Sequence, residues 1–468
     1  MKLRLAGVAA IAVLAAGCGG GGGGGSSSSS ADSLLPADTV AFATIDIDSS
    51  SAQVSSALKI LKKFPIEPRA EQQLRASLAK NGVDLNTLTS SAGSVVDVAA
   101  IIVNGKTQAV GFAKPSDEKT FAAQLDKGTS KHTTLKGWTL FSDDQGALDA
   151  VTKRSGNTLA DDPEYQAASK TLPGTGDAIA RFYVSSAGLQ TALGAAKSGL
   201  GSRASALGAL PSAKWIAGAL TSQDNAFKLE VHAKSTSTTL GAAGSSLADK
   251  IPAGSIVALA FQSSATSTVS STTEQRLQAL GQQLGIDLPG LISAVNGPVI
   301  AYVRPGIPLP EVTIASRPAK PQAAASAVGG LLARFTSGAK GVPTKVDGGT
   351  LTKLDLGPVA LYYGVNDGQL VVTDSSNALA ELKGSVGHLS GDDVFKEAKN
   401  GAGMTDNNPS FLYVDVKDAL PALSGFAQLA NQNLPPAVEN NLKPLRSVLA
   451  FGSSDSGMQS FVVYVKTS

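Results

Sequence analysis

The feature that most constrains the fold of this chain is an internal repeat with a period near 200 residues. Matched segments follow one another in the same order, and the offset between them changes only by loop-sized steps. The clearest matches are 35–41 (LPADTVA) with 251–257 (IPAGSIV), 82–85 (GVDL) with 285–288 (GIDL), and 183–184 with 413–414 (YV in both). We therefore predict a duplication, with a first repeat over 34–240 and a second over 247–468. The Ser/Thr/Gly-rich stretch from Lys234 to Ser246 is typical of a linker between them.

Within each repeat the pattern predicts an α+β domain with a mainly antiparallel sheet, because strands follow one another directly and helices separate groups of strands. A strand is expected to open each repeat, over 39–46 and 255–262. Helices are expected over 69–81 and 273–284, each followed by a glycine, Gly82 or Gly285. Ser116 or Asp117 is expected to cap a helix over 118–125. Two separate sheets and one continuous sheet are both compatible with the sequence.

The N-terminus carries a second strong signal. Lys2 and Arg4 precede an apolar stretch of about twelve residues, which suits a signal peptide over 1–17 and is too short to cross a bilayer. Cys18, the single cysteine, follows, and then come seven glycines and five serines. Such a Gly/Ser tether, placed over 18–33, holds the folded body roughly 20 Å from its attachment point on average. No later window approaches 18 uninterrupted apolar residues, so no transmembrane helix is predicted in the mature chain.

Ala15, Ala16, Gly17 and Cys18 resemble the lipobox of bacterial lipoproteins, although the position three before the cysteine is usually Leu and here is Ala15. The resemblance implies a diacylglycerol on the Cys18 thiol and cleavage before it. Acyl chains then anchor the protein, since each buried methylene contributes roughly 0.8 kcal/mol. The alternative is a plain secretory signal, cleaved elsewhere, that leaves a free thiol.

An anchored N-terminus, an LPADTVAF-type opening strand at residues 35–42 and a duplicated α+β body together resemble the bacterial domain of unknown function 3352 family. The resemblance covers residues 34–468 and implies no catalytic residues, because that family has no established activity.

Residues that could carry chemistry are sparse. The net charge of +2 disfavours a nucleic-acid partner. The three histidines are too far apart in sequence to form a helical metal motif: His132 lies in an expected polar loop, His232 in an expected strand, and the third is His388. A cysteine-rich metal site is excluded because Cys18 is the only cysteine. Paired acids at 143–144, 161–162 and 392–393 could serve acid–base chemistry or bind a hard cation, but each precedes a helix or lies at a turn, so capping is the favoured interpretation.

The cluster of Lys59, Lys62, Lys63 and Arg69 could contact anionic headgroups, at roughly 1 kcal/mol per basic residue. A solvated helix face is the favoured interpretation of this cluster.

The sequence thus predicts a lipid-anchored protein at the extracytoplasmic face of a cell membrane, without enzymatic activity or cofactor, and with a binding or envelope-structural role. Its expected partners are the membrane through the anchor and an envelope protein or a lipid ligand. The alternative is a carrier that holds a lipid or another apolar ligand in a cavity, and an enzyme with an unrecognised site is a third possibility.

Overall fold

The computed structural model describes residues 30–128, 130–200, 213–223, 225–235, 246–262, 297–306, 309–336, 340–357, 359–429, 432–455 and 457–468. Two compact units divide the chain. The first consists of Met1–Thr239, Asp455–Val462 and Thr467–Ser468, and the second of Leu240–Ser454 and Val463–Lys466. Each unit is described by itself below.

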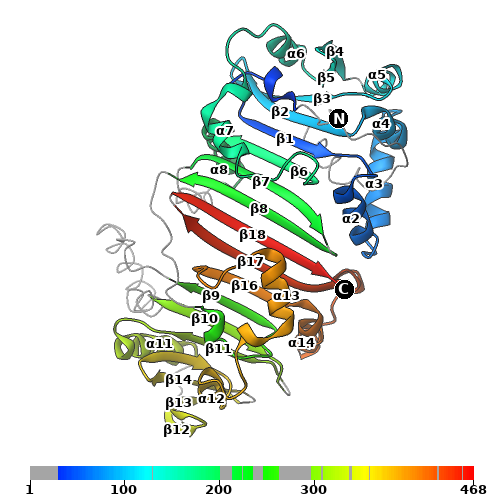
Figure 1. Cartoon of the computed structure of the whole chain (residues 1–468). Helices are drawn as coiled ribbons and strands as arrows, with labels where there is room; N and C mark the ends of the chain where they lie inside the picture. Colours follow the sequence, from blue (N-terminus) through cyan, green and yellow to red (C-terminus); the bar gives the residue numbers. More distant parts are fainter. Residues whose placement is uncertain are drawn as a thin grey trace. The chain divides into compact units, whose positions relative to one another are not determined.

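The first unit is built on an antiparallel sheet of eight paired strands, in the order β4-β5-β3-β2-β1-β6-β7-β8 (Figure 1). The central strand β1 pairs with β2 on one side, where Phe42 faces Ala99, and with β6 on the other, where Phe42 faces Tyr183. The strands are β1 (Ala41–Asp46), β2 (Val95–Val103), β3 (Lys106–Ala113), β4 (Lys131–Leu135), β5 (Trp138–Ser142), β6 (Ala180–Ser185), β7 (Ala213–Gln223) and β8 (Ala226–Ser235).

Helices connect these strands in groups, and polar caps fix where several of them begin. Asp84, Asp117, Asp144 and Asp162 each accept a backbone N–H from the first turn of the helix that follows, which satisfies donors that have no partner inside the helix. The helices are η1 (Ala31–Leu34), α2 (Ala52–Leu61), α3 (Glu67–Ala79), α4 (Leu85–Ala92), α5 (Glu118–Lys127), α6 (Gln145–Thr152), η2 (Leu159–Asp161), α7 (Pro163–Ser169) and α8 (Ser186–Leu200).

Aromatic rings occupy the centre of the first unit's core. Tyr165 of α7 meets Phe42 of β1 and Tyr183 of β6 edge to face, with ring centroids 6.1 and 5.2 Å apart. Such contacts add roughly 0.5–1.5 kcal/mol beyond the buried area. Trp215 is buried in the same cluster, so α7 is packed firmly onto β6 and β7.

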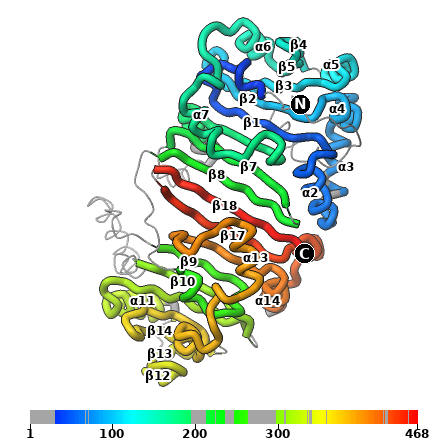
Figure 2. The backbone as a smooth tube through the Cα atoms, viewed as in Figure 1, coloured from blue at the N-terminus to red at the C-terminus, as the bar shows by residue number. Residues whose placement is uncertain are grey.

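In the second unit the strands pair antiparallel in the order β12-β13-β14-β15-β11-β10-β9-β16-β17. Figure 2 traces this part of the chain from green to red. The central strand β9 pairs with β10 and β16. The strands are β9 (Val257–Gln262), β10 (Pro298–Arg304), β11 (Glu311–Ser316), β12 (Val342–Val346), β13 (Gly349–Asp355), β14 (Ala360–Asn366), β15 (Gln369–Thr373), β16 (Ser410–Asp415) and β17 (Leu445–Asp455). Strand β18 (Met458–Thr467) is divided, with 458–462 and Thr467 in the first unit and 463–466 in the second.

The helices of the second unit include α13, which Asp392 caps through the N–H groups of Val394 and Phe395. Phe395 meets Tyr413 of β16 edge to face at 5.1 Å, and it anchors α13 to the sheet. The helices are η4 (Ala248–Lys250), α11 (Pro321–Phe335), α12 (Ala378–Leu382), η5 (Leu389–Gly391), α13 (Asp393–Ala402), α14 (Val416–Leu429) and α15 (Pro436–Leu442).

The expected class, α+β with antiparallel sheets, is confirmed. Across the described part of the chain, no helix is long and apolar enough to span a membrane. Several expectations lie outside the described residues: the signal peptide, Cys18, most of the tether, the helix over 273–284 with Gly285, and most of the linker. The helix expected over 69–81 spans Glu67–Ala79 instead.

Candidate functional site

Cys18 is the one residue to which the sequence assigns a specific role. It lies outside the described residues, so its lipidation stays a prediction. The first described residues, Ser30 and η1, belong to the first unit. The last three residues of the expected tether, 31–33, therefore lie in η1.

The three histidines each have separate partners. His132 lies in strand β4, not in a loop as expected, and its Nε2 is 3.1 Å from Oδ1 of Asp126. Residue 132 is strand because it faces Phe141 in the β4–β5 ladder. His232 lies in β8, as expected, with Nδ1 2.8 Å from Ser460 Oγ. His388 forms an isolated β-bridge with Pro252. Among the described residues no group of metal-ligating side chains is gathered.

The second acid of two pairs and the first acid of the third pair act as helix N-caps. Asp144, Asp162 and Asp392 each occupy the N-cap position of a helix. Asp161 accepts hydrogen bonds from the backbone N–H and the hydroxyl of Thr158, at 2.8 and 2.7 Å. The helix over 118–125 is capped by Asp117 and not by Ser116. These contacts favour a local structural role for the acid pairs.

The basic cluster is only partly solvated. Lys59 and Lys62 are exposed, but Lys63 Nζ donates to Oγ1 of Thr467 at 3.1 Å and to the carbonyl of Ser468. Lys63 is therefore used to hold the C-terminal residues against α2, which leaves a smaller basic surface than the sequence suggested.

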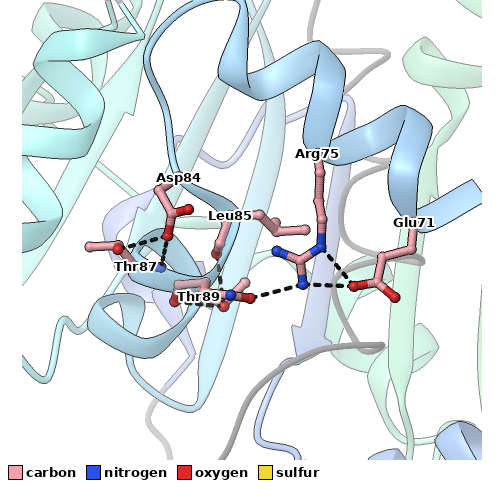
Figure 3. Close-up of polar contacts among 7 residues, drawn as sticks. Glu71, Arg75, Asp84, Leu85, Thr87 and Thr89 are labelled. Atoms are coloured by element: carbon pink, nitrogen blue, oxygen red, sulfur yellow. Dashed lines mark hydrogen bonds and ion pairs between the residues drawn. The ribbon is translucent and has the colours of Figure 1, made fainter. Parts of the chain in front are cut away.

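A neighbouring polar network joins α3 to α4 (Figure 3). Arg75 donates from Nε to Oε1 of Glu71 at 2.7 Å and from Nη2 to Oδ1 of Asn86 at 2.9 Å. Asp84 accepts the N–H and the hydroxyl of Thr87 at 2.7 Å each. Each of these donors is satisfied within the chain, so the network ties two helices together and presents no open ligand site.

A polar cavity of about 400 Å³ lies in the first unit, and we call it the Asp32 cavity. Oδ2 of Asp32 accepts the Tyr165 hydroxyl at 3.1 Å, and Oδ1 accepts the Ser33 N–H at 2.8 Å. Across the cavity, Nη1 of Arg181 donates to Thr175 Oγ1 at 3.0 Å. Burial raises the pKa of Asp32, and the hydrogen bond from Tyr165 partly offsets that rise. Asp32 and Nη1 of Arg181 are therefore already engaged with protein donors and acceptors, whereas Nε of Arg181 is buried without a hydrogen-bond partner.

Behind this cavity Asp97 is fully buried in β2, in an otherwise apolar strand. Its Oδ2 accepts the N–H of Ala31 at 2.7 Å. Burial raises the pKa of Asp97 to about 6, against the opposing effect of that N–H and of Thr44 across the ladder. Asp97 thus fixes η1 at the point where the chain enters the fold.

A second cavity, of about 360 Å³, lies in the second unit, and we call it the α14 cavity. It opens where β9 begins and where β10 and β16 end, beneath α14 and α15. All of its walls are apolar: Ile256, Val257, Val303, Pro310, Val414, Val416, Ala419, Leu420, Ala422, Leu423 and Leu442. A preformed apolar hollow of this size is the usual setting for an apolar ligand.

Sequence reasoning found neither cavity. The single Asp in the apolar segment VVDVAAIIV could have indicated that Asp97 forms a specific hydrogen bond, because a carboxylate in a buried strand requires a partner. The α14 cavity had no comparable signal, since its lining residues come from segments far apart in sequence and each is an ordinary apolar core residue.

No family model and no curated protein matches this chain, so the resemblance to the domain of unknown function 3352 family stays a prediction. Among solved structures, crystal form I of TP0453 has a TM-score of 0.25 and 9% identity, covering 46% of this chain and 82% of that one. Crystal form III of TP0453 has a TM-score of 0.26 and 8% identity, covering 46% and 84%. Similarity at this level carries no argument for fold or function.

Proposed function

We propose that this chain is a lipid-anchored, extracytoplasmic protein without enzymatic activity that binds an apolar ligand in the α14 cavity. The observation that carries the proposal is the composition of that cavity, whose eleven lining residues are all apolar. Water gains no hydrogen bonds in such a hollow, so an apolar ligand can replace it at little polar cost.

The Asp32 cavity supports a structural role better than a catalytic one. Asp32 is engaged by Tyr165 and Ser33, and Arg181 by Thr175. A general acid or base would need one of these groups directed at a substrate. Of the Asp32 cavity and the α14 cavity, the α14 cavity is therefore the better candidate for binding an apolar ligand.

We also propose that the two units arose by duplication. Strand order supports this, because β5-β3-β2-β1-β6-β7 in the first unit corresponds to β15-β11-β10-β9-β16-β17 in the second. The isolated bridge between Pro36 and Thr158 corresponds to that between Pro252 and His388. The hairpin of β12 and β13 is then an insertion in the second copy.

Attachment to the membrane rests on the sequence of residues 1–30 and supplies the setting for binding. A tether that holds the folded body roughly 20 Å from the bilayer keeps the protein near a reservoir of acyl chains. An envelope-structural role, in which the protein only bridges other components, is the second candidate. It requires no occupied cavity.

The test is native mass spectrometry of the purified full-length protein. We expect a co-purified apolar molecule that is lost in Ala419→Phe, which fills the cavity, and retained in Lys417→Phe, which adds the same ring at an exposed position of α14. An empty wild-type protein that also takes up no added lipid would count against binding and favour the structural role.

A further inference from the structure

The helix that borders the α14 cavity has a counterpart in the first unit, and the two helices begin in the same way. The N–H of Ser185, before α8, donates to the carbonyl of Val40 at 3.0 Å. The N–H of Asp415, before α14, donates to the carbonyl of Ile256 at 2.9 Å. Three residues later each helix closes an N-cap, with Gly188 N–H on Ser185 Oγ at 3.3 Å and Asp418 N–H on Asp415 Oδ1 at 3.2 Å. Gly188 and Asp418 are therefore equivalent positions.

In the first unit this position lies directly against the sheet. Gly188 is buried, and a Cβ placed on it would be 2.1 Å from the carbonyl oxygen of Val40 and 2.9 Å from Cγ1 of Val184. Real Cβ atoms do not come so close to a backbone oxygen. Only glycine therefore allows the first turn of α8 to rest on β1 and β6.

In the second unit the same position faces solvent. Asp418 is exposed. The residues that correspond to Val40 and Val184 are Ile256 and Val414, and both line the α14 cavity. The space that the backbone of α8 fills at Gly188 therefore belongs to a cavity in the second unit, and the side chains of Ala419 and Leu420 border it.

We propose that Asp418 keeps α14 off the sheet, and that the α14 cavity thereby forms a site for a single unbranched acyl chain. The inference rests on the proposed function and on the proposed duplication. An aspartate cannot approach the Ile256 carbonyl as Gly188 approaches that of Val40, because its Cβ would overlap the oxygen. The two copies have thus diverged at this helix, which is seated on the sheet in the first unit and borders a binding cavity in the second.

An acyl chain fits this site because its methylenes need no hydrogen-bond partners and the walls offer none. Leu423, on the wall, is 44% exposed, so the cavity opens to solvent along α14. A charged carboxyl or phosphate headgroup would be costly to bury among these residues and is expected to remain outside that opening. Free fatty acids and phospholipids share this chemistry.

The experiment measures binding of palmitate, by fluorescence displacement, to the full-length protein and to three variants. Asp418→Gly reproduces the residue of the first unit, Asp418→Ala removes the charge but keeps the Cβ, and Lys417→Gly introduces a glycine at the exposed neighbouring position. We expect Asp418→Gly to weaken binding at least tenfold, with Asp418→Ala and Lys417→Gly within threefold of wild type. A parallel arm measures uptake of lipid from phosphatidylglycerol vesicles.

Uptake of palmitate or of phosphatidylglycerol by wild type supports the acyl-chain site, and the arm that responds identifies the source. The role of Asp418 would be overturned if Asp418→Gly bound palmitate with wild-type affinity, or if Asp418→Ala lost as much palmitate affinity as Asp418→Gly. Either outcome would leave the proposed function intact. If the wild-type protein binds neither probe, the acyl-chain proposal fails. The proposed function fails with it only if native mass spectrometry also shows no co-purified apolar molecule.

Discussion

The backbone N–H of Ala31 donates a 2.7 Å hydrogen bond to Oδ2 of Asp97, a carboxylate with no exposed surface. This contact joins the first turn of the folded chain to the second strand of the sheet. The other carboxylate oxygen of Asp97, Oδ1, is buried and accepts no hydrogen bond. A charge in this place is therefore poorly compensated.

The raised pKa of Asp97 predicts that the first unit loses stability as pH rises. The folded state keeps this proton up to about pH 6, whereas an unperturbed aspartate releases it near 3.8. Folded protein thus binds more protons than unfolded protein between these values, so the free energy of unfolding falls by roughly 2 kcal/mol as pH rises from 4 to above 6. We expect Asp97→Asn, which cannot ionise, to match wild type at pH 4 and to exceed its unfolding free energy at pH 8.

Urea denaturation at pH 4, 6 and 8 measures this difference. Asp143→Asn, at an exposed position of the same unit, serves as the control and should follow the wild-type pH dependence. If Asp97→Asn also follows it, Asp97 does not titrate as described.

In the acid pair at 392–393, the first residue is a helix cap and the second is a surface charge. Asp392 accepts two backbone N–H groups at the start of α13, at 2.9 and 3.1 Å, whereas the side chain of Asp393 is 98% exposed. We expect Asp392→Ala to lower the free energy of unfolding by about 1 kcal/mol. Asp393→Ala should change it by less than about 0.5 kcal/mol, because exposed ion pairs contribute little. Equal effects in thermal melts would contradict the capping role.

Two glycines of α8 should respond oppositely to alanine. At Gly188 a Cβ would be 2.1 Å from the Val40 carbonyl oxygen, so Gly188→Ala should destabilise the protein by roughly 1–3 kcal/mol through overpacking. At Gly194 nothing lies within 4 Å, and Gly194→Ala should stabilise the helix by roughly 0.5–1 kcal/mol. Chemical denaturation measures both variants. A tolerated Gly188→Ala would mean that α8 is not seated on the sheet as described.

Lipidation of Cys18 predicts that the protein partitions with membranes and detergent. We expect the wild-type protein in the detergent phase of a Triton X-114 partition, with an acylated Cys18 as its first residue by mass spectrometry. Cys18→Ser should move to the aqueous phase, because without acyl chains the Gly/Ser segment has no apolar group to bind a bilayer. A wild-type protein with an unmodified terminus at another residue would contradict the anchor.

Much of the fold of the first unit could be predicted from local patterns. The strand at 95–103 follows from a nearly continuous apolar run, and the hairpin of β4 and β5 follows from the turn residues between them. Helix starts are marked by Asp117, Asp144 and Asp162, because capping acts within three residues of the chain. His132 was misplaced because a short polar strand carries little hydrophobic signal, and its state is set by pairing with β5.

The candidate binding site, the α14 cavity, depends on contacts between residues far apart in sequence. The sequence by itself predicts the anchor at Cys18, and it determined the helix caps and where several strands lie along the chain, since these features depend on residues close together in the chain. Only the tertiary structure decided that Ile256, Val303, Val414 and Leu442 surround one cavity, and that Asp418 faces solvent where Gly188 is buried. A cavity is the space that packing leaves unfilled, and packing depends on how closely a helix approaches a sheet formed by residues distant in sequence.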